Sequence, residues 1–233
     1  RAPFVVATAD VLNGVDLEST LQFHQQKKAA ATIVCARVEN PEGLGICEIN
    51  DDGRVEKFWE KPQPHQTSSR WANIALWIFE PQLLQLLPCT FNRVEDELFP
   101  QIIQNGAPVY AFRHDGYWLD VGTRERYLQA QNDALAGVFQ CEKRGVLSCE
   151  YSHRGSFSLV ENDVQIASNV RLENCVVGRD VKIECGAQIE NSVLLEGATI
   201  GENAVVRNLV VGPQMRVEKN EVAENVMLYG TKS

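Results

Sequence analysis

Short apolar segments alternate with amphipathic segments over the first 140 residues of the chain. Four apolar segments have the length of buried strands, at residues 4–7, 31–38, 73–79 and 109–112. Periodic apolar positions and capping residues predict helices over residues 17–31, from Pro81, over 95–104 and from Thr123 to Leu135. Strands that alternate with helices predict an α/β domain with a mostly parallel, Rossmann-like sheet covered by helices on both faces.

One pair of apolar segments has the pattern of a hairpin. Residues 46–49 and 55–59 flank Asp51, Asp52 and Gly53. An Asp-Gly pair between two apolar segments favours a tight antiparallel turn. The sequence therefore predicts two antiparallel strands here, followed by a polar, proline-containing loop.

The hydrophobic pattern changes in the last third of the chain into a repeat of 17 residues, marked by Asn174, Asn191, Asn208 and Asn225. Aliphatic residues recur about every six positions, with one shorter step in each repeat: Ile166, Leu172, Val177, Ile183, Ile189, Leu194, Ile200, Val206, Val211 and Val217. This period fits neither a helix nor a flat strand. It is typical of a left-handed parallel β-helix of the hexapeptide type, with three short strands in each coil.

The two patterns predict two domains. Residues 1–140 are expected to form the α/β domain, residues 141–158 a linker with a first irregular coil, and residues 159–230 the β-helix. Stacked coils bury a core that no single coil has, so the β-helix is expected to be structural and to join copies into a homo-oligomer. A hexapeptide acyltransferase is the alternative, although the repeats contain no histidine.

Composition excludes several classes of function. A net charge of -9 disfavours nucleic acid as a partner, since such affinity depends on Lys and Arg that neutralise phosphates. No apolar run approaches the roughly 18 residues that cross a bilayer, so we expect no membrane partner. The seven cysteines form no Cys-x-x-Cys pair, which favours free thiols in a cytoplasmic protein over a zinc site or disulfides.

Two acidic residues lie where ligands bind in sheets of this kind. Asp10 follows the apolar segment 4–7, and Asp120 lies between Gly116 and Thr123, just before a predicted helix. Ligands bind beyond the carboxyl ends of strands in open α/β sheets. Two carboxylates there would suit Mg²⁺, which takes few protein oxygens and completes its shell with substrate phosphates. A capping or solvated turn residue is the alternative interpretation of each.

Several stretches together resemble the sugar-1-phosphate nucleotidyltransferases, also called sugar-nucleotide pyrophosphorylases. They are Phe4 to Leu17, Glu60-Lys61-Pro62, Asn73 to Pro81, Glu95 to Pro100 and, most specifically, Gly116 to Ala130. Within that family the chain is most similar to the mannose-1-phosphate guanylyltransferases. The resemblance implies that a nucleotidyl group passes from a nucleoside triphosphate, expected to be GTP, to a sugar 1-phosphate, expected to be mannose 1-phosphate, with Mg²⁺ as cofactor.

The resemblance also implies roles for individual residues. Asp10 and Asp120 match the metal-binding aspartates, Glu60 the acid that accepts hydrogen bonds from sugar hydroxyls, and Lys61 the cation that pairs with the sugar phosphate. Gly45 matches a position where the backbone approaches the sugar closely, and Asn73 matches a ligand of a sugar hydroxyl, with Ala75 two residues after it. Trp118 is expected to form a wall of the sugar pocket, with packing beneath the pocket as the alternative.

Three positions depart from the family pattern. Ala9 and Ala75 replace glycines, and Leu44 replaces a tyrosine. Each change adds bulk or removes a hydroxyl near the expected sugar site, so a non-catalytic regulatory or scaffold paralogue is the alternative. The family's glycine-rich phosphate loop has no counterpart before Phe4, so the chain is expected to be N-terminally truncated and by itself inactive or nearly so.

Overall fold

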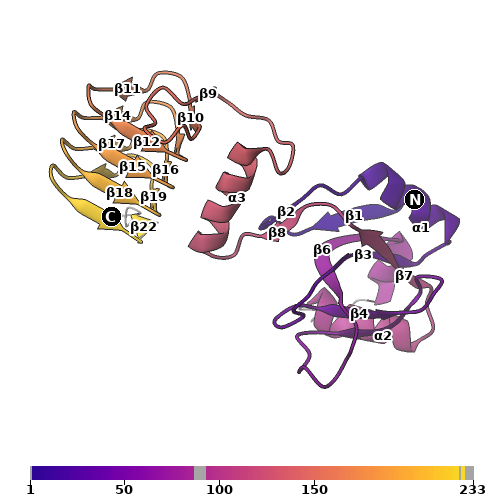
Figure 1. Ribbon diagram of the computed structural model, residues 1–233. Coiled ribbons are helices and arrows are strands. Elements are labelled where there is room, and N and C mark those ends of the chain that lie inside the picture. The colour runs from indigo at the N-terminus through magenta and orange to yellow at the C-terminus, as the bar shows by residue number, and fades with distance from the viewer. Residues whose placement is uncertain (1, 87–92, 226, 229–233) are drawn as a thin grey trace. The chain divides into compact units, whose positions relative to one another are not determined.

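The computed structural model describes residues 2–86, 93–225 and 227–228, and the chain divides into two compact units (Figure 1). The first unit is Arg1–Asp120 and the second is Val121–Ser233. The observed division therefore lies before the helix that precedes residue 140, not after it. Within the described ranges, no helix is both long enough and apolar enough to cross a membrane.

One mixed sheet forms the first unit. Its strands follow the order β5 (Val55–Trp59), β4 (Ile46–Ile49), β6 (Trp71–Phe79), β3 (Ala31–Arg37) and β7 (Val109–His114), and β1 (Phe4–Ala7) also pairs with β6. The expected α/β class is confirmed, but the prediction of a mostly parallel sheet is wrong. Among the described strands of this sheet only β3 and β7 run parallel, while β6 is antiparallel to β1, β3 and β4.

The connections explain these strand directions. The predicted hairpin joins β4 to β5 in antiparallel pairing. Parallel neighbours need a crossover of a dozen or more residues, usually a helix, and residues 60–70 contain no helix before β6 begins. The length of an apolar run indicates that a strand is buried, but it carries no information about direction.

The helices of the first unit are short. α1 (Leu17–Gln26) begins after Asp16, whose carboxylate accepts hydrogen bonds from the backbone of the first turn. The segment after Pro81 is a 3₁₀ helix, η1 (Pro81–Leu86), in its described part. The helix expected over residues 95–104 is a π-helical turn, η2 (Val94–Leu98), followed by α2 (Phe99–Gln104).

Aromatic side chains hold α2 and η2 against the sheet. Phe99 is fully buried, and its ring centroid lies 5.0 Å from that of Phe58, 5.6 Å from that of Trp77 and 6.1 Å from that of Phe79. Tilted and edge-to-face contacts of this kind add to the stabilisation that burial provides. The turn that precedes Phe99 is therefore fixed beside β5 and β6.

The second unit is a parallel β-helix, as predicted (Figure 1). Its first sheet contains β9 (Val146–Ser148), β10 (Ser158–Val160), β13 (Val176–Val177), β16 (Val193–Leu194), β19 (Val210–Val211) and β22 (Met227–Leu228). The second contains β11 (Gln165–Ile166), β14 (Lys182–Ile183), β17 (Thr199–Ile200) and β20 (Arg216–Val217). The third contains β12 (Arg171–Glu173), β15 (Gln188–Glu190), β18 (Val205–Arg207) and β21 (Val222–Glu224).

Each coil turns three corners through residues with left-handed backbone angles. One column of corners is Asn174, Asn191, Asn208 and Asn225. The second is Asn169, Gly186, Asn203 and Asn220, and the third is Asp163, Asp180, Gly197 and Gln214. Asn, Asp and Gly adopt these angles at the lowest steric cost, which explains why the 17-residue spacing is visible in the polar residues.

Helix α3 (Arg124–Ala136) packs on the β-helix, and Thr123 caps it as predicted. Leu128 lies in a buried apolar cluster with Val193 and Val210. The predicted boundary near residue 140 separated this helix from the coils that it contacts. Its contacts place α3 in the second unit.

Amide side chains extend the asparagine column into α3. Asn132 Nδ2 donates to Asn191 Oδ1, and Asn191 Nδ2 donates to Asn208 Oδ1, both at 2.7 Å. Gln131 Nε2 donates to the backbone oxygen of Asn174 at 2.7 Å. The corner residues thus have a second role, since their amides bind one another and dock the helix.

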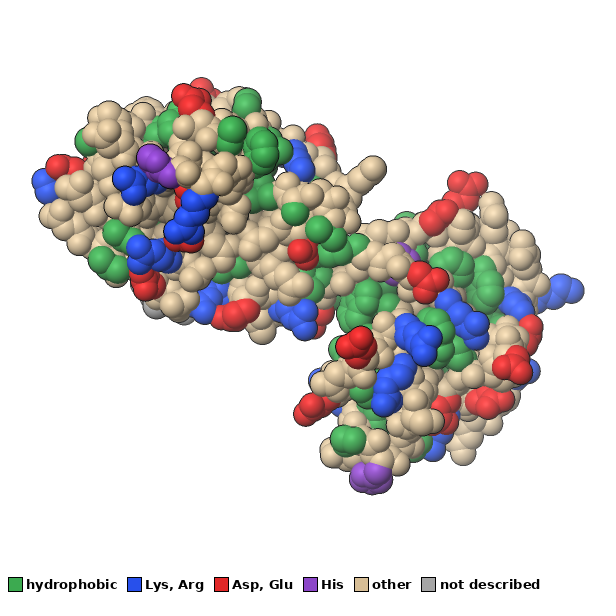
Figure 2. All heavy atoms as spheres, in the orientation of Figure 1, with side chains coloured by type: hydrophobic (Ala, Val, Ile, Leu, Met, Phe, Trp, Pro, Cys, Tyr) green, Lys and Arg blue, Asp and Glu red, His purple; other side chains and the backbone are tan. Residues whose placement is uncertain are grey.

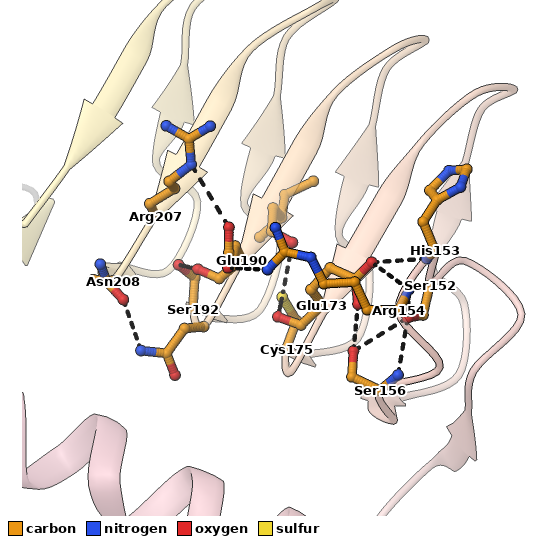
Figure 3. Close-up of polar contacts among 12 residues, drawn as sticks. Ser152, His153, Arg154, Ser156, Glu173, Cys175, Glu190, Ser192, Arg207 and Asn208 are labelled. Carbon is orange, nitrogen blue, oxygen red and sulfur yellow. Dashed lines mark hydrogen bonds and ion pairs between the residues drawn. The ribbon is translucent and has the colours of Figure 1, made fainter.

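The carboxylate of Glu173, a partly buried residue of β12, binds the loop that precedes β10 (Figure 3). Glu173 accepts hydrogen bonds from the hydroxyls of Ser152 and Ser156 and from the backbone N–H groups of His153 and Arg154, the last two at 2.7 and 3.3 Å. Desolvation opposes the charge, but these four bonds outweigh it and lower the pKa of Glu173 to about 2. The loop before β10 is therefore tied to an ionised side chain of β12.

We expect Glu173→Gln to destabilise the β-helix by about 1–2 kcal/mol, because hydrogen bonds to the ionised carboxylate are lost. The folded pKa of about 2 lies below the ordinary value of 4.5, so this contribution is complete above pH 4.5 and is lost as pH falls toward 2. Urea unfolding between pH 3 and 7 measures it. Glu190→Gln, which removes the exposed ion pairs of Glu190 with Arg154 and Arg207, is the control and should change stability by less than about 0.5 kcal/mol. Equal effects of both variants would contradict the assignment.

His24 of α1 is buried in the first unit. Its side chain is 1% exposed, its Nδ1 lies 2.8 Å from Thr32 Oγ1, and its Nε2 lies 3.5 Å from Glu80 Oε1. Burial lowers the pKa of His24, and the Glu80 carboxylate opposes this shift in part. The imidazole is therefore neutral in the folded unit near pH 7.

Because the pKa of His24 is lower in the folded state than its ordinary value of 6.5, its protonation favours unfolding. We expect stability to fall as pH drops below 6.5, and His24→Asn to remove this part of the pH dependence. Glu80→Gln should steepen it, since the opposing carboxylate is lost. Thermal unfolding measured from pH 5 to 8 tests both, and identical pH slopes in all three proteins would refute the role of His24.

Candidate functional site

One predicted acid lies in a small ladder of the first unit, and the other lies in the turn that leads into it. β2 (Val11–Asn13) pairs antiparallel with β8 (Trp118–Asp120), and Val11 is opposite Asp120. Asp10, in the turn between β1 and β2, directly precedes Val11, and both carboxylates belong to exposed residues. Residues 110 positions apart in the sequence are thus one step apart across a strand pair.

The two carboxylates of Asp10 and Asp120 are too few to hold a metal ion by themselves, but they are enough for Mg²⁺ when a substrate supplies further ligands. In the described part of the chain, no group of three or more His, Cys, Asp or Glu side chains could hold a metal ion. Mg²⁺ needs only one or two carboxylates when substrate phosphates and water supply its other ligands. These two residues could hold such an ion only together with a phosphorylated substrate.

A second group of predicted residues surrounds the start of β4. The backbone N–H of Asn73 donates to Gly45 O at 2.8 Å, and that of Lys61 donates to Leu44 O at 3.2 Å. A Cβ at Gly45 would lie 2.8 Å from Phe58 Cζ and 3.1 Å from Glu60 Oε2. A larger residue here would therefore force the Phe58 ring, and to a lesser extent Glu60, to shift. The structure brings Gly45, Glu60 and Asn73 together.

The hydrogen bonds of Asn73 determine which of its groups a ligand could meet. Its Oδ1 accepts from the backbone N–H of Ala75 at 3.0 Å and from Trp77 Nε1 at 2.8 Å. Both partners can only donate, so the oxygen must face them and the amide orientation is fixed. Asn73 can therefore offer a ligand only its Nδ2 donors.

Glu60 is the acidic side chain of this group. Its side chain is 18% exposed, with Lys61 Nζ 3.9 Å and Arg93 Nη2 3.3 Å from Oε1. Burial, followed by the negative charges of Glu95 and Asp96, raises the pKa of Glu60 above its ordinary value. The positive charges of Arg93 and Lys61 oppose this rise in part. The protonation state of Glu60 thus depends on the cations beside it.

Lys61 and Ala75 share an unusual backbone. Both have left-handed angles, with φ of 45° and 56°, which an L residue adopts at some cost. The Lys61 side chain is 61% exposed, although its Nζ also lies 3.9 Å from Glu60 Oε1. The Ala75 angle explains why glycine was expected there, and its backbone oxygen accepts from Thr8 N at 3.1 Å.

Trp118 has a packing role in this structure. It pairs with Asn13 in the β2–β8 ladder and packs, partly buried, against Val34, Ala36 and Ile74. Of the two roles predicted for it, a wall of the sugar pocket or the packing beneath, these contacts describe the second.

Cations also gather on the unit that carries these residues. Arg113 lies 5.1 Å from the ring centroid of Trp71, and Lys57 Nζ lies 3.5 Å from that of Trp59. Figure 2 shows Lys and Arg side chains grouped on one face of this unit, with hydrophobic side chains between them.

Residues 1–137 match the nucleotidyl transferase family, and residues 155–233 match the GMPPB C-terminal domain. The chain belongs to the nucleotidyl transferase family, in the branch of the sugar-1-phosphate nucleotidyltransferases, as the sequence motifs indicated.

Named relatives use different nucleotides and sugars. The chain is 32% identical over 141 residues to the mannose-1-phosphate guanylyltransferase catalytic subunit beta of Danio rerio, covering 60% of this chain and 38% of the relative. It is 32% identical over 146 residues to the UTP–glucose-1-phosphate uridylyltransferase of Synechocystis sp. (61% and 37%). It is 31% identical over 140 residues to the glucose-1-phosphate adenylyltransferase of Clostridium novyi (56% and 36%). The matched part spans well under half the length of these curated relatives.

We expect Gly45→Ala to destabilise the first unit by about 1–3 kcal/mol, because the new methyl group would overlap the buried Phe58 ring. Gly14→Ala is the matched control, since a Cβ there would meet nothing nearer than 3.9 Å. Urea unfolding of the two variants measures the difference. Equal stability would show that Phe58 and Glu60 can move away freely, which would contradict a rigid sugar site.

Proposed function

We propose that the protein transfers a nucleotidyl group from a nucleoside triphosphate to a sugar 1-phosphate, with Mg²⁺ bound by Asp10 and Asp120. A phosphate oxygen of the sugar 1-phosphate forms a bond to the α-phosphorus of the triphosphate, and the bond to the leaving pyrophosphate breaks. The observation that carries this proposal is the β2–β8 pairing, which sets the two acids one step apart. Family membership supports it.

The residues of the second group supply sugar binding in this proposal. Glu60 accepts hydrogen bonds from sugar hydroxyls, Asn73 Nδ2 donates to another, and the backbone at Gly45 approaches the ring closely. Lys61 pairs with the sugar phosphate through its exposed ammonium group. Such a reaction depends on positioning and on compensation of charge more than on covalent chemistry by the protein, and bound Mg²⁺ would compensate phosphate charge.

We propose GTP and mannose 1-phosphate as the substrates. The match of residues 155–233 to the GMPPB C-terminal domain supports this choice over UTP or ATP with glucose 1-phosphate. So does the name of the Danio rerio relative. A panel of nucleoside triphosphates and sugar 1-phosphates, with pyrophosphate release as the readout in the complete natural protein, distinguishes the three pairs. Absence of turnover with every pair would favour a non-catalytic paralogue.

In the complete natural protein we expect Asp120→Asn to lower kcat by on the order of 10²-fold, as loss of one preorganised electrostatic group does. Asp115→Asn, which removes an exposed acid from the connection between β7 and β8, should leave kcat unchanged. The Mg²⁺ concentration for half-maximal rate should rise only in the Asp120 variant. Unchanged rates for Asp120→Asn would reject the metal assignment.

A further inference from the structure

Arg93 contacts the carboxylate of the candidate sugar site, although no motif in the sequence indicated it. Its Nη2 lies 3.3 Å from Glu60 Oε1, and its Nη1 lies 3.0 Å from Asp96 Oδ2. The Arg93 side chain is 51% exposed, whereas that of Glu60 is 18% exposed. One guanidinium therefore bridges two acids from the solvent side and contacts one oxygen of Glu60.

The backbone holds Arg93 in this place. Arg93 is extended, with φ of -140° and ψ of 135°, and it directly precedes η2. Phe99, immediately after η2, is fully buried against Phe58. Phe58 in turn lies beside the position where Gly45 would carry a Cβ. The packing of Phe99 against Phe58 thus fixes both the backbone at Arg93 and the ring that lies beside Gly45.

The two oxygens of Glu60 have different surroundings. Oε1 has Arg93 and Lys61 as neighbours, at 3.3 and 3.9 Å. Oε2 is 3.1 Å from the point where a Cβ of Gly45 would lie, so it faces the close backbone approach. A carboxylate that is held at one oxygen keeps the other in a defined direction.

We propose that Arg93 is a positioning residue, which holds one oxygen of Glu60 and directs its second oxygen toward a hydroxyl of the sugar 1-phosphate. This inference rests on the proposed function, because Glu60 must be the sugar ligand for Arg93 to act through it. It adds a residue that sets sugar affinity without contacting the sugar.

The charges around Glu60 indicate the direction of the effect. Lys61 and Arg93 favour the ionised form, whereas burial, Glu95 and Asp96 favour the protonated form. Arg93 is the nearer of the two cations. Its removal leaves Lys61, at 3.9 Å, against two acids, so the pKa of Glu60 should rise further and protonation should begin at a higher pH.

The test uses Arg93→Met, Arg93→Lys and Glu60→Gln in the complete natural protein, with Arg113→Met as a control for loss of an arginine elsewhere on the first unit. Titration followed by ¹³C NMR of labelled glutamate carboxyls, assigned with Glu60→Gln, reports the pKa of Glu60 directly. Steady-state rates with mannose 1-phosphate from pH 5 to 8 report KM and kcat separately.

For Arg93→Met we expect the pKa of Glu60 to rise and KM for the sugar 1-phosphate to increase roughly tenfold, with a smaller change in kcat. The acid limb of kcat/KM should move to higher pH. Arg93→Lys should restore the position of that limb, because it keeps the charge, while KM stays raised because the bridge to Asp96 is lost. Arg113→Met should change none of these quantities.

Two results would overturn the inference, and a third would overturn the proposed function. An unchanged pKa of Glu60 in Arg93→Met would show that the contact has no electrostatic effect. A raised pKa with an unchanged KM and acid limb, when Glu60→Gln does weaken sugar binding, would show that Arg93 does not act on the site. If Glu60→Gln itself leaves KM unchanged, Glu60 is not the sugar ligand and the assignment of the sugar site fails.

Discussion

The first unit depends on the edges of one strand, β6, which must hydrogen-bond three neighbours. β3 follows one edge of β6 along its length, and β1 and β4 share the other. β1 pairs with residues from Leu76 to Phe79, and β4 pairs with Trp71 and Ala72. Along this edge, β6 therefore changes its partner from β4 to β1 between Ala72 and Leu76.

The backbone is irregular at this passage. Ala75 has a positive φ, and the register with β3 shifts between Ile33 and Cys35. Irregular strand positions re-aim side chains and are frequent beside functional sites. Thr8 binds the backbone of Ala75 on the β1 side, and Gly45 binds that of Asn73 on the β4 side. The turn that carries Asp10 and the group around Glu60 thus both begin where β6 changes partners.

The sequence predicted those features that depend on local backbone chemistry. The β-helix was evident because each corner needs a residue that tolerates left-handed angles, which leaves Asn, Asp or Gly at a fixed interval. The hairpin around Gly53 was evident for the same reason. Strand direction was not, since burial alone determines an apolar run, and the sheet proved mixed. The docking of α3 was also not evident, because it depends on amide pairs between residues 59 positions apart, such as Asn132 and Asn191.

The candidate site divides in the same way. Asp10, Glu60 and Asn73 were found through motifs, whereas Arg93 was not, because its partner lies 33 residues away and a surface arginine before an acidic turn has many other interpretations. Arg93 also matters for the electrostatics of the site, because it contacts the carboxylate of Glu60. The amide oxygen of Asn73 is engaged by two obligate donors, so that residue presents only donors.

In the proposed site Glu60 is the acceptor, and it accepts most strongly while ionised, although burial works against ionisation. If this partly buried carboxylate binds sugar hydroxyls as proposed, a cation beside it favours the ionised form, and that cation must leave one oxygen free. Arg93 meets this condition because it approaches from the solvent side, and its other nitrogen is anchored on Asp96. The polarity of the site thus follows from packing: the indole of Trp77 fixes the donor, and the core beneath Phe99 fixes the cation that maintains the acceptor.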